Sequence, residues 1–137
     1  MDAEPLTGHC LCGSVRFEIV EPPVSVGYCH CTRCQRRTGT AASLNARLAP
    51  GSLHVLAGEE LLQAYRPPGG SPKVFCSACG GALWSADAEG RASGVRLGVL
   101  DRDPGLPASY RQYVAYAAPW EPIPDDGLPR FPEARTS

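Results

Sequence analysis

Seven cysteines in three short groups constrain this chain more than any other feature of its sequence. Scattered cysteines are often buried apolar side chains, whereas tight groups are typical of metal ligands. An odd number also leaves at least one thiol without a disulfide partner. We therefore predict zinc sites built from thiolates. The groups contain every cysteine of the 137 residues: Cys10 and Cys12; Cys29, Cys31 and Cys34; Cys76 and Cys79.

The spacing within each group suits binding of a single ion. In a Cys-x-x-Cys turn such as Cys76 to Cys79, both sulfurs fold onto one metal, and the following Gly80 permits the tight turn. In an extended Cys-x-Cys such as Cys10 to Cys12, side chains two positions apart project to the same face. The sequence thus predicts pairs of sulfurs that combine to complete a tetrahedral site.

Seven sulfurs divide into one set of four and one set of three, but the order of the groups allows two partitions. One closed site combines the pair at residues 31 and 34 with the pair at 76 and 79. Their separation of 41 residues exceeds the usual interval of about 15 to 20 in zinc ribbons. The other combines residues 10, 12, 76 and 79, which leaves the middle group as a three-sulfur site with an open position. Spacing alone does not choose between them.

Glycine and proline limit the fold class. The chain has 15 glycines and 14 prolines, which interrupt regular structure and leave little room for long helices. Its length is typical of one domain with its own core. We expect a mainly β, single small domain over residues 1–137, with a core of about residues 6–118 and an extended tail at residues 119–137.

Short strands are expected along most of the chain. The clearest is at residues 14–20, where Val15, Phe17 and Ile19 alternate with polar side chains. Residues 32–38 predict about one helical turn that ends at Gly39. Further strands are expected at residues 24–28, 40–48, 52–56, 82–85, 94–100 and 112–117, with shorter extended stretches at 61–66 and 73–75.

Charge and hydropathy exclude some partners. The formal charge of −1 provides no field that would attract nucleic acid, and no apolar stretch approaches the ~20 residues of a membrane span. The start of the chain is acidic where a signal peptide would be basic. We therefore expect a cytoplasmic protein that does not bind membranes, and the charge weakens the case for a nucleic-acid partner. A homo-oligomer is compatible with the sequence.

Four stretches together resemble the glutathione-dependent formaldehyde-activating enzyme family, which also contains centromere protein V. The first is the run from Gly8 to Phe17, and the second runs from Cys29 to Gly39. The third is Phe75 to Gly80, and the fourth is the tail with Ala118-Pro119-Trp120 and Asp126 to Pro129. The resemblance covers nearly the whole chain. It implies a mainly antiparallel β-tent fold.

The resemblance also implies a division of the cysteines and an activity. It places Cys10, Cys12, Cys76 and Cys79 on a structural zinc, which is one of two zinc ions expected per chain. It places Cys29, Cys31 and Cys34 on a second zinc with a catalytic role. The implied activity is that of a carbon-sulfur lyase on the glutathione adduct of formaldehyde, S-(hydroxymethyl)glutathione, or on a related thiol adduct of another small aldehyde.

Side chains near the middle group are candidates for substrate binding. Arg33 lies within this group and Arg36 and Arg37 follow it, and a guanidinium group could hold a carboxylate of glutathione. His30 lies between two proposed ligands, where an acid–base role and a packed turn are both open. Two positions depart from the family pattern: Gln35 stands where many relatives have arginine, and Arg111 where relatives often have histidine.

A second class of function is a non-catalytic zinc module that binds a protein or nucleic acid. A middle group without a fourth ligand favours the enzyme. Closure of that group by a side chain such as His9 or His54 would favour the binding module.

Overall fold

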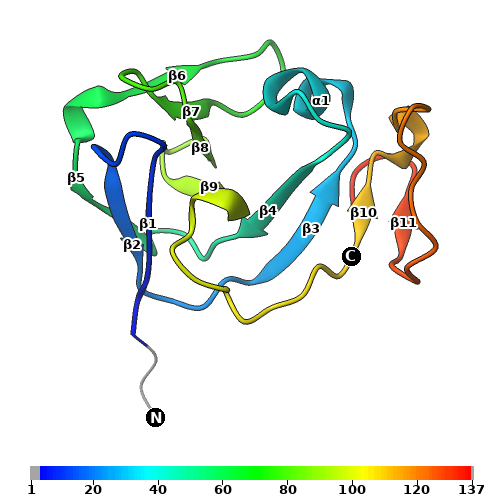
Figure 1. Ribbon diagram of the computed structural model, residues 1–137, viewed down its shortest axis with the longest axis horizontal. Helices are drawn as coiled ribbons and strands as arrows, with labels where there is room; N and C mark the ends of the chain where they lie inside the picture. Colours follow the sequence, from blue (N-terminus) through cyan, green and yellow to red (C-terminus); the bar gives the residue numbers. More distant parts are fainter. Residues whose placement is uncertain (1–3, 137) are drawn as a thin grey trace. The chain divides into compact units, whose positions relative to one another are not determined.

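The computed structural model describes residues 4–136, and this part of the chain is mainly β (Figure 1). Short strands alternate with turns, and the longest helix is one α-helix of seven residues. The mainly β class predicted from glycine and proline is therefore confirmed. The chain divides into two compact units. The first contains residues up to 24 and residues 46–105, and the second contains residues 25–45 and those from 106 onward.

A three-stranded antiparallel sheet opens the first unit. Its order is β1 (Leu6–His9), β2 (Arg16–Ile19) and β5 (Leu53–Ala57). Val15, Phe17 and Ile19 are buried, as the alternation of apolar and polar side chains predicts. The connection from β1 to β2 carries the first cysteine pair.

A four-stranded meander also belongs to the first unit. Consecutive antiparallel pairs join β6 (Leu62–Tyr65), β7 (Lys73–Cys76), β8 (Ala82–Ala86) and β9 (Ala92–Arg96). Trp84 on β8 meets Phe17 on β2 edge to face, with 5.4 Å between the ring centroids. The turn from β7 to β8 carries the last cysteine pair.

The second unit is built around one strand and the helix that follows it. β3 (Ser25–Cys29) leads through two residues into α1 (Thr32–Thr38), and α1 ends at Gly39, which has φ = 72°. The predicted helical turn is thus confirmed. β10 (Arg111–Gln112) pairs with β3 and with β11 (Arg130–Phe131), and both pairings are parallel. Along the chain, β4 (Ser43–Arg47) crosses the boundary between the units.

The structure differs from the sequence prediction in several places. The strand expected at residues 94–100 ends at Arg96, and a 3₁₀ turn at Leu97–Val99 follows. A strand was expected at residues 112–117, but the chain leaves β10 after Gln112 because Tyr113 is left-handed, with φ = 58°. A 3₁₀ turn at Val114–Tyr116 follows. Strand β1 was not predicted, and the tail contains β11 rather than being extended throughout. The pairs of β10 with β3 and β11 in the second unit are parallel, whereas the pairs of the first unit are antiparallel.

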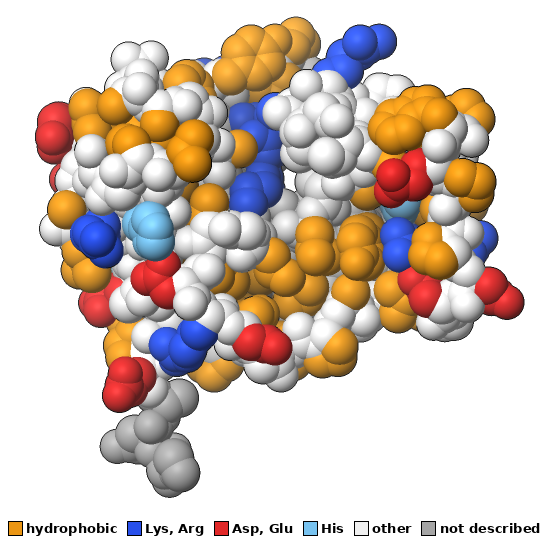
Figure 2. Space-filling model, in the orientation of Figure 1, with side chains coloured by type: hydrophobic (Ala, Val, Ile, Leu, Met, Phe, Trp, Pro, Cys, Tyr) orange, Lys and Arg blue, Asp and Glu red, His pale blue; other side chains and the backbone are white. Residues whose placement is uncertain are grey.

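The surface agrees with the near-neutral charge. On the face seen in Figure 2, acidic and basic side chains are dispersed among apolar and uncharged ones, without an extended basic patch. Among residues 4–136, no helix has the length and apolar character needed to cross a membrane.

Candidate metal centres

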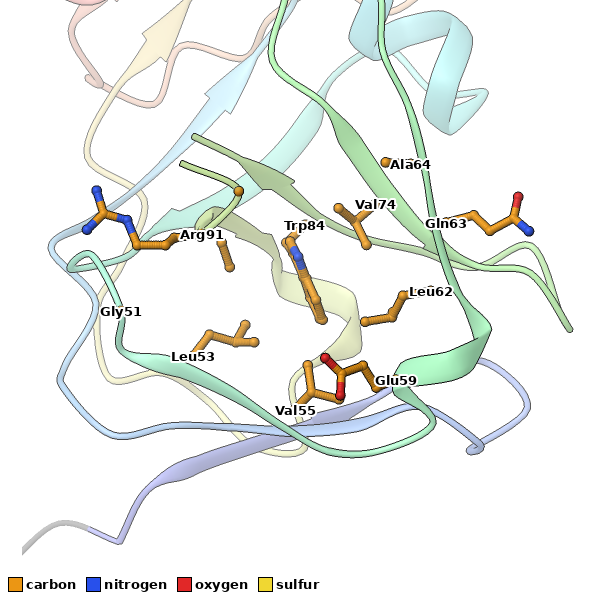
Figure 3. Close-up of a pocket in the computed structure, with 12 residues that line it drawn as sticks. Gly51, Leu53, Val55, Glu59, Leu62, Gln63, Ala64, Val74, Trp84 and Arg91 are labelled. Carbon is orange, nitrogen blue, oxygen red and sulfur yellow. The ribbon is translucent and has the colours of Figure 1, made fainter. Parts of the chain in front are cut away.

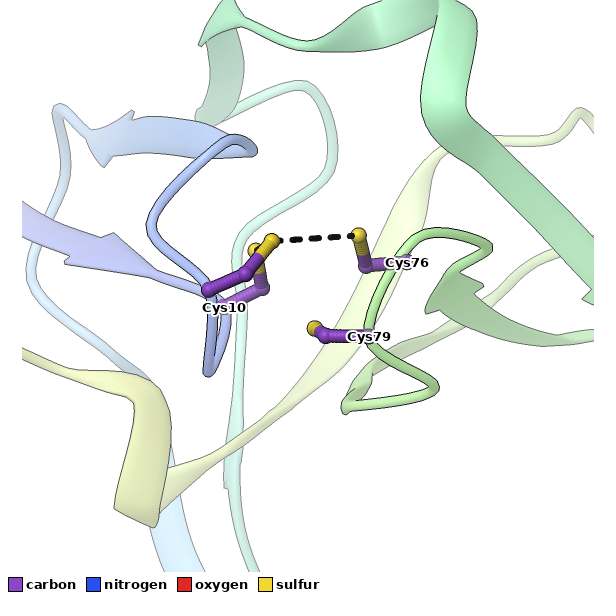
Figure 4. Close-up of side chains that lie close together, drawn as sticks. Cys10, Cys76 and Cys79 are labelled. Atoms are coloured by element: carbon purple, nitrogen blue, oxygen red, sulfur yellow. Dashed lines mark hydrogen bonds between the residues drawn. The ribbon is translucent and has the colours of Figure 1, made fainter.

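The first unit brings the first and last cysteine pairs together. Figure 4 shows the sulfurs of Cys10, Cys76 and Cys79 converging from the two turns. All four sulfurs, including that of Cys12, lie within 4.8 Å of one another. The Cys10 and Cys12 sulfurs are 3.6 Å apart, and the Cys12 and Cys76 sulfurs are 4.0 Å apart. This is the second of the two partitions that spacing left open.

Local backbone geometry holds these sulfurs in place. In the last pair, the Gly80 amide donates to the Cys76 carbonyl at 2.7 Å, with Gly80 at φ = 76°. In the first pair, the Gly13 amide donates to the Cys10 carbonyl at 3.0 Å, and the Val15 amide donates to the Cys10 sulfur at 3.3 Å. Both turns thus form from local hydrogen bonds and from a glycine in the left-handed region.

The geometry fits a tetrahedral zinc ion. With Zn–S bonds of about 2.3 Å, the edge of a sulfur tetrahedron is about 3.8 Å, which lies between the Cys10–Cys12 and Cys12–Cys76 sulfur separations. A hydrogen bond with Ser14 lowers the pKa of Cys12, and a backbone hydrogen bond with Gly81 lowers that of Cys79. Burial raises the pKa of Cys76 to about 11. A cation would offset the cost of ionising this buried thiol.

The middle group stands by itself in the second unit. Cys29 ends β3, Cys31 is the N-cap of α1, and Cys34 lies within the helix. The three sulfurs lie within 4.8 Å of one another. Within residues 4–136, no further histidine, cysteine or carboxylate joins either this group or the four-cysteine group. His9 pairs instead with Asp101 at 2.7 Å, so it does not close the middle group.

Crowding of the three sulfurs also favours a cation. Contact with Cys31 and then with Cys34, together with burial, raises the pKa of the Cys29 thiol well above its usual range. The physical cause is that ionisation there would add a negative charge beside two other sulfurs. A divalent cation removes this penalty. The donor set of three thiols suits zinc and leaves one coordination position for an external ligand.

The three candidate arginines differ in their surroundings. Arg37 is half-buried, and its Nη2 has no hydrogen-bond partner within the described part of the chain. Burial lowers the pKa of Arg37, while charge on Cys34 and Cys31 opposes this effect, so its guanidinium lies within electrostatic range of both sulfurs. Arg33 and Arg36 are exposed.

Arg36 lines a cavity of about 380 Å³ in the second unit. Thr32 and Thr40 contribute hydroxyl groups to its wall, and Trp120, with an exposed fraction of 65%, contributes an aromatic surface. Such a cavity offers a positive charge, hydroxyl groups and an apolar surface to a ligand. That combination suits a small peptide with a free carboxylate.

Gln35, one of the two departures from the family pattern, has a structural role here. Its side-chain amide donates to the carbonyl oxygens of His30 and Tyr116, each at 2.9 Å. The first bond fixes the backbone between the proposed ligands Cys29 and Cys31. The second joins α1 to the 3₁₀ turn of the tail.

Arg111, the other departure, lies in a buried polar cluster that sequence reasoning did not find. Its Nη1 is 3.1 Å from His30 Nε2, and its Nε and Nη2 donate to Asp126 Oδ2 at 3.1 and 2.8 Å. The guanidinium lies 4.0 Å from the centroid of the Tyr28 ring. These hydrogen bonds from Arg111 lower the pKa of Asp126. In the sequence, the only indication of this cluster was that Arg111 stands where relatives often have histidine.

A further pocket, of about 440 Å³, lies in the first unit. Figure 3 shows apolar side chains pointing into it, with Glu59 beside them and Arg91 at the other end. Neither cysteine nor histidine lines this pocket, and Arg91 is paired with Asp87 at 2.9 Å. The pocket therefore has room for a ligand, but no evident reactive side chain lines it. Its apolar side chains include Leu53, Val55, Leu62, Val74 and Trp84.

All seven cysteines are free thiols and lie in the described part of the chain. The structure thus brings together each predicted set of ligands. His30 is buried within the second unit, where Arg111 contacts it.

Comparisons with known proteins agree with this geometry. The family model described as "Glutathione-dependent formaldehyde-activating enzyme" matches residues 5–116. A protein of Halomonas elongata named as a putative glutathione-dependent formaldehyde-activating enzyme is 30% identical over 90 residues, which are 60% of this chain. The match spans only 56% of that relative's length.

A solved structure is also similar. The crystal structure of a Rhodobacter sphaeroides protein, determined as a structural genomics target, matches with a TM-score of 0.53 and 25% sequence identity. The match covers 91% of this chain and 98% of the other. With the family model matching most of the chain, from β1 to the 3₁₀ turn at Val114–Tyr116, the protein belongs to the glutathione-dependent formaldehyde-activating enzyme family.

Proposed function

We propose that the protein is a zinc-dependent carbon-sulfur lyase that acts on a glutathione adduct of formaldehyde or of another small aldehyde. The observation that carries this proposal is the middle group, in which three sulfurs converge and no fourth side-chain donor joins them in the described residues. In this proposal Cys29, Cys31 and Cys34 hold the catalytic zinc. Cys10, Cys12, Cys76 and Cys79 hold a structural zinc, so the protein contains two.

The chemistry of the open site follows from its ligands. A zinc ion held by these three sulfurs would supply one open coordination position, where it would lower the pKa of a bound thiol. Three thiolates and one divalent cation together carry a charge of −1, and a substrate thiolate makes the site more negative. The half-buried guanidinium of Arg37 lies within range of Cys31 and Cys34 and offsets this charge.

Substrate binding is assigned to the three arginines of α1 and the adjoining cavity. Arg36 binds a glutathione carboxylate in the cavity that Trp120 and Thr40 also line. Arg33, exposed on the same helix, adds positive charge near the cavity for the second carboxylate. Arg33 and Arg36 are both exposed, and exposed charge pairs are weak, so the aromatic surface should also contribute to the affinity.

The reaction needs no oxidant or reductant. In the cleavage direction the carbon-sulfur bond of S-(hydroxymethyl)glutathione breaks and its electron pair stays on sulfur. The hydroxyl oxygen loses its proton as the carbonyl of formaldehyde forms, and that proton restores the thiol of free glutathione. Synthesis is the reverse. Seven free thiols suit a reducing compartment, and we assign the protein to the cytoplasm.

Exchange spectroscopy tests the activity, because formaldehyde also adds to glutathione without a catalyst. We expect the zinc-loaded protein to increase the NMR exchange rate between S-(hydroxymethyl)glutathione and its components at least tenfold over the uncatalysed rate. Cys34→Ser should abolish this increase while the zinc at the four-cysteine site remains. An exchange rate equal to the uncatalysed one, with both zinc ions present, would favour a non-catalytic zinc module.

Calorimetry tests the binding role of the helix arginines. We expect Arg36→Ala to weaken glutathione binding about fivefold to tenfold, the effect of losing one charge-assisted hydrogen bond. Arg66→Ala is the matched control, because Arg66 is an exposed arginine of the first unit. Equal Kd values for the two variants would show that Arg36 does not bind a carboxylate of glutathione.

A further inference from the structure

The backbone between two ligands of the middle group is held from both sides. Two peptide groups join Cys29 to Cys31, one on each side of His30. The His30 amide donates to the Gln112 carbonyl at 3.0 Å, and the His30 carbonyl accepts from the Gln35 side chain at 2.9 Å. Each planar peptide group is therefore fixed by one hydrogen bond. Because these planes set the directions of the neighbouring side chains, they determine where the sulfurs of Cys29 and Cys31 can meet.

Gln35 uses both N–H groups of its side-chain amide. A glutamine Nε2 carries two donors, and the second one donates to the Tyr116 carbonyl at 2.9 Å. Gln35 is half-buried, and its backbone amide donates to the Cys31 carbonyl at 3.0 Å in the first turn of α1. The side chain thus links the backbone between two proposed ligands to the 3₁₀ turn at Val114–Tyr116.

The tail holds this 3₁₀ turn in turn. The Tyr113 amide donates to the Glu133 carbonyl at 2.9 Å, and the Tyr116 hydroxyl donates to the Glu133 carboxylate at 3.0 Å. The Ala115 amide donates to the Pro132 carbonyl at 3.2 Å. Residues 132 and 133 lie beyond the stretch that the family model matches. The support for the Tyr116 carbonyl therefore comes from a part of the tail outside that stretch.

Tyr113 indicates that the turn is kept at a local cost. Its φ of 58° is left-handed, and among the described residues it is the one non-glycine with a positive φ. A side chain with a Cβ makes this conformation unfavourable, so it persists only where the surroundings impose it, often at functional sites. Here the reversal ends β10 and begins the turn that presents the Tyr116 carbonyl to Gln35.

We propose that Gln35 is a positioning residue that raises the zinc affinity of the middle group by fixing the backbone between Cys29 and Cys31. The inference rests on the zinc assignment of the proposed function, and it gives the tail a role in retaining that ion. Three thiols on a short loop bind more tightly when the loop is already ordered, because ordering it costs conformational entropy. Groups that hold metal ligands in place are typically worth a factor of about 10 to 100 in metal affinity.

Zinc affinity tests this role without any activity assay. Gln35→Met keeps the length of the side chain and removes both donors. In competition with a zinc-binding dye, we expect its middle group to bind zinc about tenfold more weakly, while the four-cysteine site of the same protein is unchanged. A bond that only stabilises the fold would stabilise the zinc-bound and zinc-free forms equally and would leave this affinity unchanged.

Gln112→Met is the matched control. The Gln112 side chain accepts from the Arg135 amide at 2.9 Å, so this variant also loses a side-chain bond within the second unit. The Gln112 carbonyl, which accepts from the His30 amide, is retained. We expect its zinc affinity to stay within about twofold of that of the wild type. Circular dichroism checks that every variant is folded, and Gln35→Asn, whose amide is too short to reach both carbonyls, replaces Gln35→Met if that variant does not fold.

Cobalt spectra give a second readout. Cobalt(II) bound by thiolates absorbs visible light in bands that depend on the arrangement of its ligands. Cys34→Ser provides the spectrum of the four-cysteine site, and subtraction from the wild-type spectrum gives that of the middle group. We expect Gln35→Met to change the bands of the middle group and Gln112→Met to leave them as they are.

The outcomes separate this inference from the proposed function. A zinc Kd for folded Gln35→Met within about twofold of the wild-type value overturns the inference and leaves the lyase proposal standing. An equal loss of affinity in Gln112→Met also overturns it, because the effect would then be a general loosening of the unit. If Gln35→Met weakens zinc binding but zinc-loaded wild-type protein shows no exchange activity, the positioning role stands and the lyase proposal falls. If the wild-type middle group binds no zinc, both fall.

Discussion

Replacing Cys76 should destabilise the chain far more than replacing Cys34, although both are proposed zinc ligands. The four-cysteine site joins turns that are 64 residues apart in sequence, as the Cys12 and Cys76 sulfurs show. The middle group lies within one short stretch, residues 29–34, and connects no distant segments. The two sites should therefore contribute very different amounts to the free energy of unfolding.

The magnitude follows from two effects at Cys76. By analogy with a covalent cross-link, a link that closes a loop of this length contributes about 4 kcal/mol. Cys76 has an exposed fraction of 0%, so the serine hydroxyl would be buried without its metal partner, at a cost of about 1 to 3 kcal/mol. We expect Cys76→Ser to lose about 5 to 7 kcal/mol, a large part of a typical total of about 5 to 15. Cys34→Ser, in a short loop, should lose about 1 to 2 kcal/mol.

Urea unfolding followed by circular dichroism measures both values. The exposed Ser77→Ala, in the same turn as Cys76, is the control and should change little. Addition of a strong chelator should destabilise the wild-type protein by an amount close to that of Cys76→Ser and should have little further effect on that variant. Similar small losses, below about 1 kcal/mol, for Cys76→Ser and Cys34→Ser would refute the reasoning.

Two further predictions concern single contacts. Because hydrogen bonds from Arg111 lower the pKa of Asp126, its carboxylate stabilises the fold above the unfolded pKa near 4, and this stabilisation is lost as the pH falls through the lower folded value. Asp126→Asn should therefore reduce the unfolding temperature most above about pH 5, and a difference that grows toward acid pH would contradict this assignment. Gly58→Ala should destabilise the chain by more than about 2 kcal/mol in urea unfolding, because Gly58 has φ = 81° and an added Cβ would collide with the Ser14 carbonyl oxygen. Gly69→Ala, at φ = 66° with open space around it, should lose only about 1 kcal/mol, and equal losses would exclude the collision as the cause.

Sequence patterns predicted the elements whose cause is local. The alternation at Val15, Phe17 and Ile19 marks β2 because one face of that strand is buried. The helical turn before Gly39 was predicted because glycine readily adopts the left-handed conformation that ends a helix. The spacing of the cysteines predicted the groups but not their partition, which depends on which distant turns meet and which only the family resemblance indicated.

The remaining features depend on contacts between distant residues. Arg111 and Asp126 are 15 residues apart, and only the path of the tail brings them together. The strand expected at residues 112–117 ends early because Tyr113 adopts a left-handed backbone that its side chain does not signal. The bond from Gln35 to the Tyr116 carbonyl joins residues that are 81 apart, so no sequence window reveals it.

The central claim is that one chain holds one closed and one open zinc site. Native mass spectrometry of protein purified without chelators counts the zinc per chain, before and after brief mild chelation, with and without glutathione. We predict two zinc ions, of which one is removed by chelation and is protected by glutathione. A single zinc ion, or two that leave together regardless of glutathione, would contradict the account.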